Sequence, residues 1–254
     1  MHNNYFYTCE YLMKINHRIL GILPPHHQFC YFYALIFTNR EMGNNETNRF
    51  FYSDGYRLGM EVVEKGITDE SIQEVVQILF STMDGLIGSL LQQAERSGVK
   101  VDCAKGCSWC CHQPVFGHTF ELQYLANQIR QTQTPDKVDE IRERAIAKNN
   151  RVKAMEEKEM LNYKSPCPLL ENNACMTYDA RPMACRIYLS TRVASCLLFY
   201  SHPAEPENYP ALLDFPLKAG RMLNQGFLAA LKQHNRPGKE FRLEEGLSVF
   251  LKPL

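Results

Sequence analysis

Cysteine placement constrains this chain more than any other feature of its sequence. Eight of its ten cysteines fall between Cys103 and Cys196, and the other two, Cys9 and Cys30, lie far upstream. A thiol-rich segment of this kind binds metal, forms disulfides or carries out redox chemistry, depending on compartment and spacing. The clustered cysteines, which are the predicted metal ligands, are Cys103, Cys107, Cys110, Cys111, Cys167, Cys175, Cys185 and Cys196.

The balance of charges argues against some classes of partner. The chain has 28 Lys and Arg against 28 Asp and Glu, so it lacks the long-range positive field with which proteins bind phosphate backbones or acidic membranes. Because of this balance we expect neither nucleic acid nor a membrane as partner. The cysteines predict a metal ion as partner instead. No run approaches the ~20 apolar residues of a membrane span, and no secretory signal is visible near Met1. These points predict a cytoplasmic protein, in which thiols stay reduced.

Residues 1–41 are predicted to form an irregular N-terminal extension. They are rich in Tyr, Phe and His and show no clean helical or strand periodicity. We expect Met42 to be the true start, so that residues 1–41 are not translated. Residues 42–254 are predicted to be a single helical domain with a cysteine core at 102–196, because 45% hydrophobic residues allow a sizeable core.

Apolar periodicity predicts a mainly α fold, in which helices are joined by cysteine-bearing loops that metal staples together. Apolar residues repeat at intervals of three and four over 68–98, which predicts one long helix capped by Thr68. Further helices are expected at 119–131 and 216–232. A threonine cap followed by proline opens a long charged helix over 134–160, whose charges form a solvated face.

The first cysteine group contains a Cys-x-x-Cys pair and two adjacent cysteines. It begins at Cys103, and the spacing of Cys107 and Cys110 is that of a tight turn that aims two sulfurs at one metal. Gly106 supplies the backbone freedom that such a turn needs. Adjacent cysteines do not easily face the same ion. Cys110 and Cys111 therefore serve different centres, or one binds metal while the other packs.

The second group places its cysteines among turn-forming residues. Cys167, Cys175 and Cys185 are accompanied by Pro168, Asn172, Asn173 and Pro182, which favour turns over a helix interior. Cys196 follows eleven residues after Cys185, and we expect it either to bind metal or to remain a buried free thiol. Turns that hold cysteines between helices suit a metal staple.

Basic residues and histidines lie near both groups. A metal held by four thiolates is anionic, and Lys105, Arg181 and Arg186 are the expected cations that neutralise it. The two arginines are equally suited to holding a turn by bonding carbonyls. His112 and His118 are alternative ligands that could replace a sulfur, with a surface or core role as the simpler interpretation.

The combined spacing resembles a known family. Cys-x3-Cys-x2-Cys-Cys, then Cys-Pro-Leu, then Cys-x2-Tyr-x2-Arg-Pro-x2-Cys-Arg is similar to the YkgJ-type cysteine-cluster family of zinc- or iron-chelating proteins. The matching residues are Cys103, Cys107, Cys110, Cys111, Cys167, Pro168, Leu169, Cys175, Tyr178, Arg181, Pro182, Cys185 and Arg186. The resemblance implies chelation of zinc or an iron–sulfur cluster through two cysteine groups, with no established reaction. It matches Cys196 to a less regular late cysteine.

Three alternatives remain open, and with them the question whether the chain is an enzyme. Flagellin lysine N-methylases resemble this family in their cysteine cluster, which suggests an iron–sulfur protein methylase that uses S-adenosylmethionine. The segment Cys103-x3-Cys107-x-Trp109-Cys110 also resembles the radical S-adenosylmethionine triad, although the strand–helix repeats of that fold do not follow it. A thiol-redox protein would use Cys107 and Cys110, but the βαβ pattern that normally accompanies such a pair is missing. Spacing alone does not choose between zinc and iron.

Overall fold

The fold is taken from a computed structural model that describes residues 44–252. Contacts within the chain divide it into residues 1–47 and residues 48–254, and the described elements belong to the second unit and to the helix that leads into it. The predictions of an irregular extension over 1–41 and of a start at Met42 lie outside the described residues, and they stay predictions.

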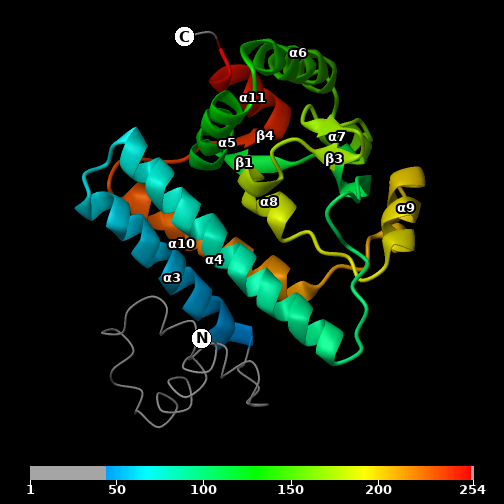
Figure 1. Ribbon diagram of the computed structural model, residues 1–254, viewed down its shortest axis with the longest axis horizontal. Coiled ribbons are helices and arrows are strands. Elements are labelled where there is room, and N and C mark those ends of the chain that lie inside the picture. The colour runs from blue at the N-terminus through cyan, green and yellow to red at the C-terminus, as the bar shows by residue number, and fades with distance from the viewer. Residues whose placement is uncertain (1–43, 253–254) are drawn as a thin grey trace. The chain divides into compact units, whose positions relative to one another are not determined.

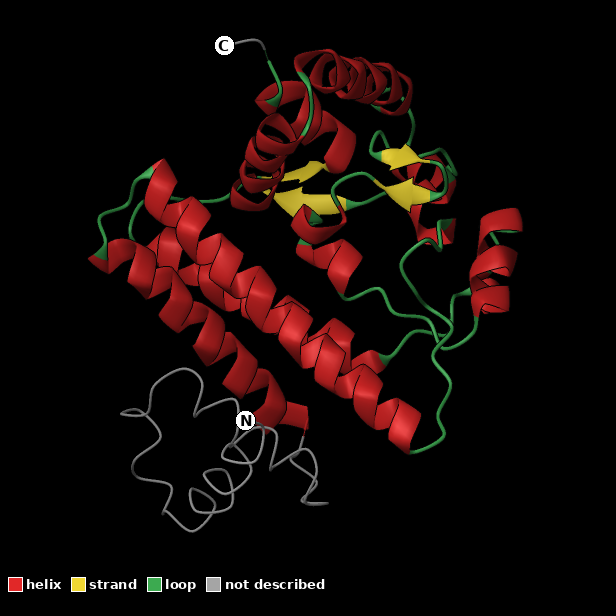
Figure 2. Cartoon of the chain, in the orientation of Figure 1, coloured by secondary structure: helices red, strands yellow, loops and turns green. Residues whose placement is uncertain are grey.

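The described chain is mainly helical, as the apolar periodicity predicted (Figures 1 and 2). The stapling of its loops by metal stays a prediction. In chain order the elements are α3 (Asn44–Glu64), α4 (Asp69–Arg96), η2 (Trp109–His112), β1 (Phe116–His118), α5 (Thr119–Thr132), α6 (Pro135–Val152), α7 (Glu157–Asn162), β2 (Leu170–Glu171), β3 (Ala174–Cys175), η3 (Tyr178–Ala180), α8 (Met183–Arg186), α9 (Val193–Ser201), η4 (Pro206–Asn208), α10 (Asp214–Gln233), β4 (Glu240–Arg242) and α11 (Leu243–Phe250).

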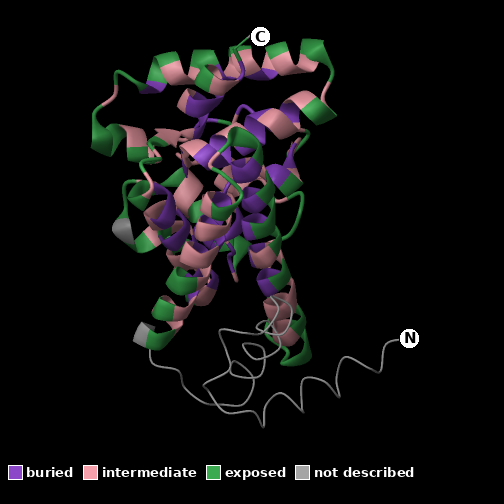
Figure 3. Ribbon diagram, turned by 90° about the vertical axis from the view of Figure 1, so that its left-hand side faces the viewer, coloured by how far each residue is buried: buried purple, intermediate pink, exposed green. Residues whose placement is uncertain are grey.

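Helix α4 confirms the long helix predicted over 68–98. Thr68 caps it, since its hydroxyl accepts a bond from the Ser71 amide at 3.1 Å, and the Ser71 hydroxyl in turn accepts from the Thr68 amide. The side chains on its apolar stripe are almost fully buried. They are Ile72, Val75, Val76, Leu79, Phe80, Met83, Leu86 and Ile87. Figure 3 shows how buried positions gather in the interior of the described part of the chain. Burial of this stripe against neighbouring helices fixes the long axis of the core.

The other predicted helices are present with one difference. Helices α5 and α10 match the expected ranges, and the Thr134 hydroxyl caps α6, with Pro135 in its first turn. The charged helix does not continue to residue 160. Helix α6 ends at Val152, its last buried residue, and a turn separates it from the short exposed helix α7. This break turns the chain back towards the first cysteine group, where the Ser165 amide bonds the His112 carbonyl at 3.0 Å.

Short strands and two further helices complete the frame that carries the cysteines. Strands β1 and β4 pair antiparallel, with Gly117 opposite Phe241, and β2 and β3 form a small hairpin. Helix α11 packs on α5 and α6, and α9 packs on η2. The sequence analysis did not predict α3, α9 or α11.

By length and composition alone, α4 could also cross a membrane. Polar residues such as Gln77 and Asp84 interrupt its apolar sequence, and the expectation that the chain does not enter a membrane stays a prediction. The apolar stripe of α4 is nevertheless buried within the described structure, and the core helix of a soluble protein passes the same test. A single such helix is weak evidence for a membrane span.

Glycines bring α3 and α10 into direct backbone contact. A side chain at Gly226 on α10 would collide with the backbone of Tyr52 on α3, and one at Gly55 on α3 would collide with the backbone of Leu223 on α10. The two helices cross closely because neither position carries a β-carbon. This crossing holds α3 on the core next to α4 (Figure 1).

Replacing Gly226 with alanine should therefore destabilise the fold, by about 1–3 kcal/mol as in other overpacked cores. Gly88 provides the matched control, because it lies within α4 and a β-carbon there meets no atom within 4 Å. Gly88→Ala should raise stability by about 0.5–1 kcal/mol through helix propensity. Urea unfolding of both variants measures the contrast, and shifts of the same sign would contradict the close crossing.

Candidate metal centre

All eight predicted ligands lie in the described part of the chain and carry free thiols. Cys196 is buried and the other seven are partly exposed. Cys9 and Cys30 fall outside the described residues. Within residues 44–252, no three His, Cys, Asp or Glu side chains form a ready-made metal site. The pocket, the backbone hydrogen bonds and the mutual effects of the thiols on their pKa values show how the cysteines are arranged.

Four of the cysteines line one pocket. They are Cys103, Cys107, Cys110 and Cys196, and the pocket also includes Tyr188 and Val193. The first group and α9 thus contribute to the same small pocket. A pocket surrounded by four sulfurs offers the donor set that Zn²⁺ and iron accept in tetrathiolate sites.

Backbone bonds fix the loop of the first group. The Cys103 amide donates to the Ser190 carbonyl at 3.1 Å, and the Cys107 amide donates to the Ala104 carbonyl at 3.0 Å. Gly106 has a φ of 97°, a conformation that residues with side chains rarely adopt. Gly106 therefore lies in a turn between Cys103 and Cys107, and the turn predicted for the Cys107–Cys110 pair itself stays a prediction.

The remaining cysteines gather around the β2–β3 hairpin. The Cys167 amide donates to the Cys111 carbonyl at 2.7 Å, and the Leu170 amide donates to the Cys167 carbonyl at 2.9 Å. Cys175 lies opposite Leu170 in the hairpin. Cys111 and Cys175 are thus both connected to Cys167 through short backbone links. Burial raises the pKa of Cys185, on α8, and the nearby thiols of Cys167, Cys175 and Cys111 raise it further, so Cys185 belongs with this group.

Two asparagines close this hairpin. Asn172 and Asn173 have φ values of 49° and 59°, and they separate the paired residues Glu171 and Ala174. Positive φ at both central residues is the geometry of a two-residue hairpin turn, and asparagine tolerates it well. The asparagine pair that indicated a turn in the sequence therefore places Cys175 beside Cys167.

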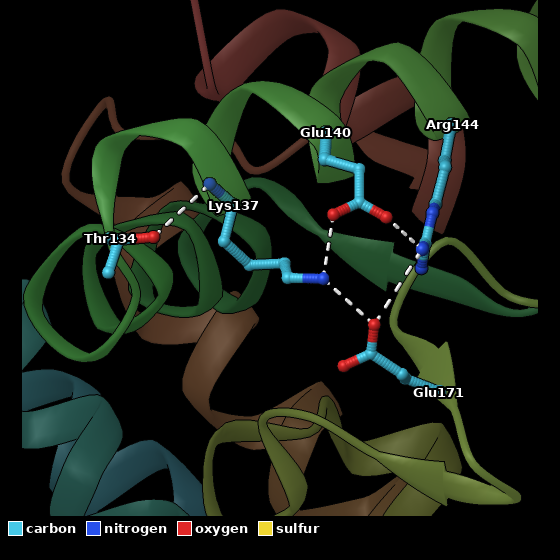
Figure 4. Close-up of polar contacts among 5 residues, drawn as sticks. All are labelled: Thr134, Lys137, Glu140, Arg144 and Glu171. Atoms are coloured by element: carbon cyan, nitrogen blue, oxygen red, sulfur yellow. Dashed lines mark hydrogen bonds and ion pairs between the residues drawn. The ribbon is translucent and has the colours of Figure 1, made fainter.

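Helix α6 anchors the hairpin through ion pairs (Figure 4). Lys137 Nζ lies 2.8 Å from Glu171 Oε1 and 2.6 Å from Glu140 Oε2. Arg144 pairs with Glu140 and lies 3.8 Å from Glu171. Further along α6, Lys148 Nζ donates to the carbonyls of Ser165 and Pro166 at 3.1 and 3.3 Å, just before Cys167. The charged helix is therefore also a support for the second cysteine group.

Two buried polar residues hold α8 in place. The Glu121 carboxylate accepts bonds from the amides of Met183 and His118, each at 2.8 Å, and from the Asn224 side chain at 3.0 Å. The Arg186 guanidinium bonds Asp84 and the Asp179 carbonyl, and it donates from Nε to the Arg181 carbonyl at 2.8 Å. Together they fix the backbone on both sides of Cys185.

Of the predicted cations, Arg181 lies among the thiols and Arg186 does not. Arg181 lowers the pKa of Cys103, Cys175 and Cys185, although less strongly than burial raises it. The bonds of Arg186 give it the scaffold role. Lys105 lies 5.2 Å from the centre of the Tyr178 ring.

Lys148 was not predicted from the sequence. Its charge adds to the lowering of the pKa of Cys111 by the Cys110 hydrogen bond, and it partly opposes the rise that burial causes in the pKa of Cys167. No spacing rule connects a lysine in a charged helix to these cysteines. Its position becomes visible only where α6 packs beside the loop that precedes Cys167.

Burial makes most of these thiols poor acids in the absence of metal. It raises the pKa of Cys103, Cys175, Cys185 and Cys196, and that of Cys167 to about 12. The adjacent pair behaves differently. The hydrogen bond between Cys110 and Cys111 lowers the pKa of Cys111 to about 7 and raises that of Cys110. One proton therefore leaves this pair readily, and metal binding has to displace the others.

The two histidines do not line the pocket. His112 Nδ1 lies 3.0 Å from the Ser108 carbonyl, and its ring packs against Tyr200. His118 stacks on Phe120, and among the described residues its buried Nδ1 has no hydrogen-bond partner. These contacts favour the structural interpretation of both side chains and leave sulfur as the common donor.

Lys164, three residues before Cys167, is an unusual cation at the edge of the site. Its Nζ lies 3.8 Å from the centre of the Phe199 ring on α9 and is buried without a hydrogen-bond partner in the described structure. Burial lowers the pKa of Lys164 to about 8. The ring contact connects the segment of the second group to the helix that carries Cys196.

We expect the Lys164 ammonium to titrate near pH 8, whereas an ordinary lysine titrates near ~10.4. Between these values the unfolded chain holds a proton that the folded protein has released, so the free energy of unfolding should rise with pH across this window. Carbon NMR of lysine side chains measures the titration, with Lys164→Arg to assign the resonance. A transition near 10 would contradict the buried position.

Comparison with known proteins gives one match. Residues 102–207 match the family model described as "CxxCxxCC: Putative zinc- or iron-chelating domain". Comparison with curated proteins and with solved structures gives none. The matched range contains all eight clustered cysteines and the elements from η2 to α9. Residues 102–207 are therefore similar to the CxxCxxCC family of zinc- or iron-chelating domains.

Proposed function

We propose that this chain is a metal-binding protein that holds zinc or iron through its eight clustered cysteines. One observation carries the proposal: Cys196 lines the same pocket as Cys103, Cys107 and Cys110, although it is far from these three residues in the sequence. The other four are neighbours around the β2–β3 hairpin. An all-sulfur donor set of this size suits zinc or iron better than Mg²⁺ or Ca²⁺, which prefer oxygen.

Metal binding would also stabilise the fold. The loops that carry the cysteines contain few regular elements, and the two groups are joined by single bonds such as that between the amide of Cys167 and the carbonyl of Cys111. Because ligands must be brought together to bind, the free energy of metal binding becomes free energy of folding in such a region. We infer a reducing compartment, the cytoplasm, since thiolate ligands have to stay unpaired.

Nothing in the described structure or in the comparisons supports the methylase, radical or thiol-redox alternatives. A metal-free protein with a reversible disulfide between Cys107 and Cys110 would favour the thiol-redox alternative.

Anaerobic purification of the full chain, with metal analysis and a visible spectrum of the same sample, tests the proposal. We expect bound zinc in a colourless protein, or bound iron and sulfide with absorption near ~400 nm. Cys30→Ser is the matched control, because Cys30 lies outside the predicted ligand set and should leave the metal content unchanged. A metal-free protein would refute the proposal, and a reversible disulfide between Cys107 and Cys110 would then favour thiol redox chemistry.

A further inference from the structure

We propose that the eight cysteines form two separate four-thiolate centres, divided between the adjacent residues Cys110 and Cys111. This inference rests on the proposed function and adds the number of centres and the ligands of each. The first centre consists of Cys103, Cys107, Cys110 and Cys196. The second centre consists of Cys111, Cys167, Cys175 and Cys185.

The pocket defines the first centre. Its lining contains four cysteines and none of the other four. Cys103 and Cys107 come from the loop before η2, Cys110 from η2, and Cys196 from α9. Helix α9 packs on η2, and the ring of Tyr200 on α9 lies 5.3 Å from that of Trp109. This contact brings Cys196 to the first group, although 85 residues separate it from Cys111 in the sequence.

Backbone links define the second centre. The Cys167 amide donates to the Cys111 carbonyl. Cys175 pairs with Leu170 in the hairpin, and the Leu170 amide donates to the Cys167 carbonyl. Cys185 follows on α8, whose first amide is fixed by Glu121. The effects of one thiol on the pKa of another agree with this grouping. Besides burial, Cys111, Cys167 and Cys175 raise the pKa of Cys185. The pKa of Cys103 is raised instead by burial and by Cys107 and Cys196.

The geometry of η2 explains the division between neighbours. Cys110 and Cys111 both lie in this 3₁₀ helix, in which successive side chains project about 120° apart. One faces the pocket and the other faces the hairpin. Their side chains still contact each other through a hydrogen bond, which raises the pKa of Cys110. Cys185, a ligand of the second centre, also raises the pKa of Cys110. The two centres are therefore adjacent, and a single shared cluster is the alternative that the experiment has to exclude.

The surroundings of the two centres differ. Lys148, held by the carbonyls of Ser165 and Pro166, supplies a positive charge beside Cys111 and Cys167. The first centre opens into the pocket and has no comparable lysine in its lining. A nearby cation favours an anionic tetrathiolate site, so we expect the second centre to release its metal more slowly.

Native mass spectrometry of the full chain, reconstituted with Zn²⁺ and then exposed to a competing chelator, tests the division. We expect two zinc ions in the wild-type protein and one in each of Cys103→Ser and Cys175→Ser. The double variant should bind none, and the control Cys30→Ser should keep both. Cys107→Ser and Cys167→Ser provide a second variant for each centre, and far-UV circular dichroism identifies variants that remain folded.

The outcomes separate this inference from the proposed function. Wild-type protein without any zinc or iron refutes both. One zinc ion per chain, or more than two, overturns the division whether or not the variants fold, while leaving metal binding intact. Loss of both ions from a folded Cys103→Ser or Cys175→Ser protein would show one shared cluster, which also overturns it.

Discussion

Replacing Arg186 with methionine should lower the free energy of unfolding by about 2–4 kcal/mol, one of the largest effects expected from a single substitution in this chain. The Arg186 side chain is 0% exposed. It bonds Asp84 on α4 and the carbonyls of Asp179 and Arg181, and its guanidinium lies 4.3 Å from the centre of the Phe80 ring. Methionine fills much of the same volume but leaves both carbonyls without these donors.

The partner carboxylate should matter less than the arginine. The Asp84 side chain is 42% exposed, and an asparagine there keeps a carbonyl oxygen that accepts a hydrogen bond from the buried guanidinium. We therefore expect Asp84→Asn to cost about 1 kcal/mol. Arg221→Met, on the exposed side of α10, is the control and should stay within about 0.5 kcal/mol of the wild type. Urea unfolding ranks the three variants, and an Arg186 variant as stable as the Arg221 variant would contradict the scaffold role.

Removing the metal should produce the second large effect. The free energy of unfolding should fall by about 4 kcal/mol relative to protein held with the metal at a thousandfold excess over its dissociation constant. The loss should be local. The cysteine loops depend on the metal, whereas the buried stripe of α4 and the α3–α10 crossing do not contain any of the predicted ligands. We expect hydrogen exchange to accelerate at 102–118 and 163–190 and to change little in α4 and α10.

Hydrogen–deuterium exchange with and without a chelator measures this pattern. Cys30→Ser protein serves as the control, because it should respond to the chelator in the same way as the wild type. Equal protection of the cysteine loops in both conditions, with the metal confirmed as removed, would show that the loops hold their structure without it.

The long helices could be predicted because their apolar residues repeat with the helical period. The buried face of a helix was harder to predict than its range where small residues pack against the core. On α10, the buried face includes Ala219, Gly220, Gly226 and Ala230 beside Leu223 and Phe227, and a search for large apolar residues passes over the small ones. The short helices α9 and α11 were missed because each has only two turns or so of pattern, which is too little to identify a period.

The site was predictable as a set of residues and less so as an arrangement. The eight cysteines and the turn at Gly106 follow from spacing. Whether Cys110 and Cys111 face one ion or two could not be decided without η2, and the place of Cys196 depends on how α9 packs. Lys148 and Glu121 belong to helices whose patterns look like ordinary solvated or core faces, so their roles follow from tertiary contacts alone.

X-ray absorption at the edge of the bound metal, on the protein as purified, tests the central claim most directly. The account predicts a first shell made of sulfur only, at about 2.3 Å if the metal is zinc, because four thiols surround the pocket and four more surround the hairpin. A shell dominated by nitrogen or oxygen at about 2.0–2.1 Å would contradict it.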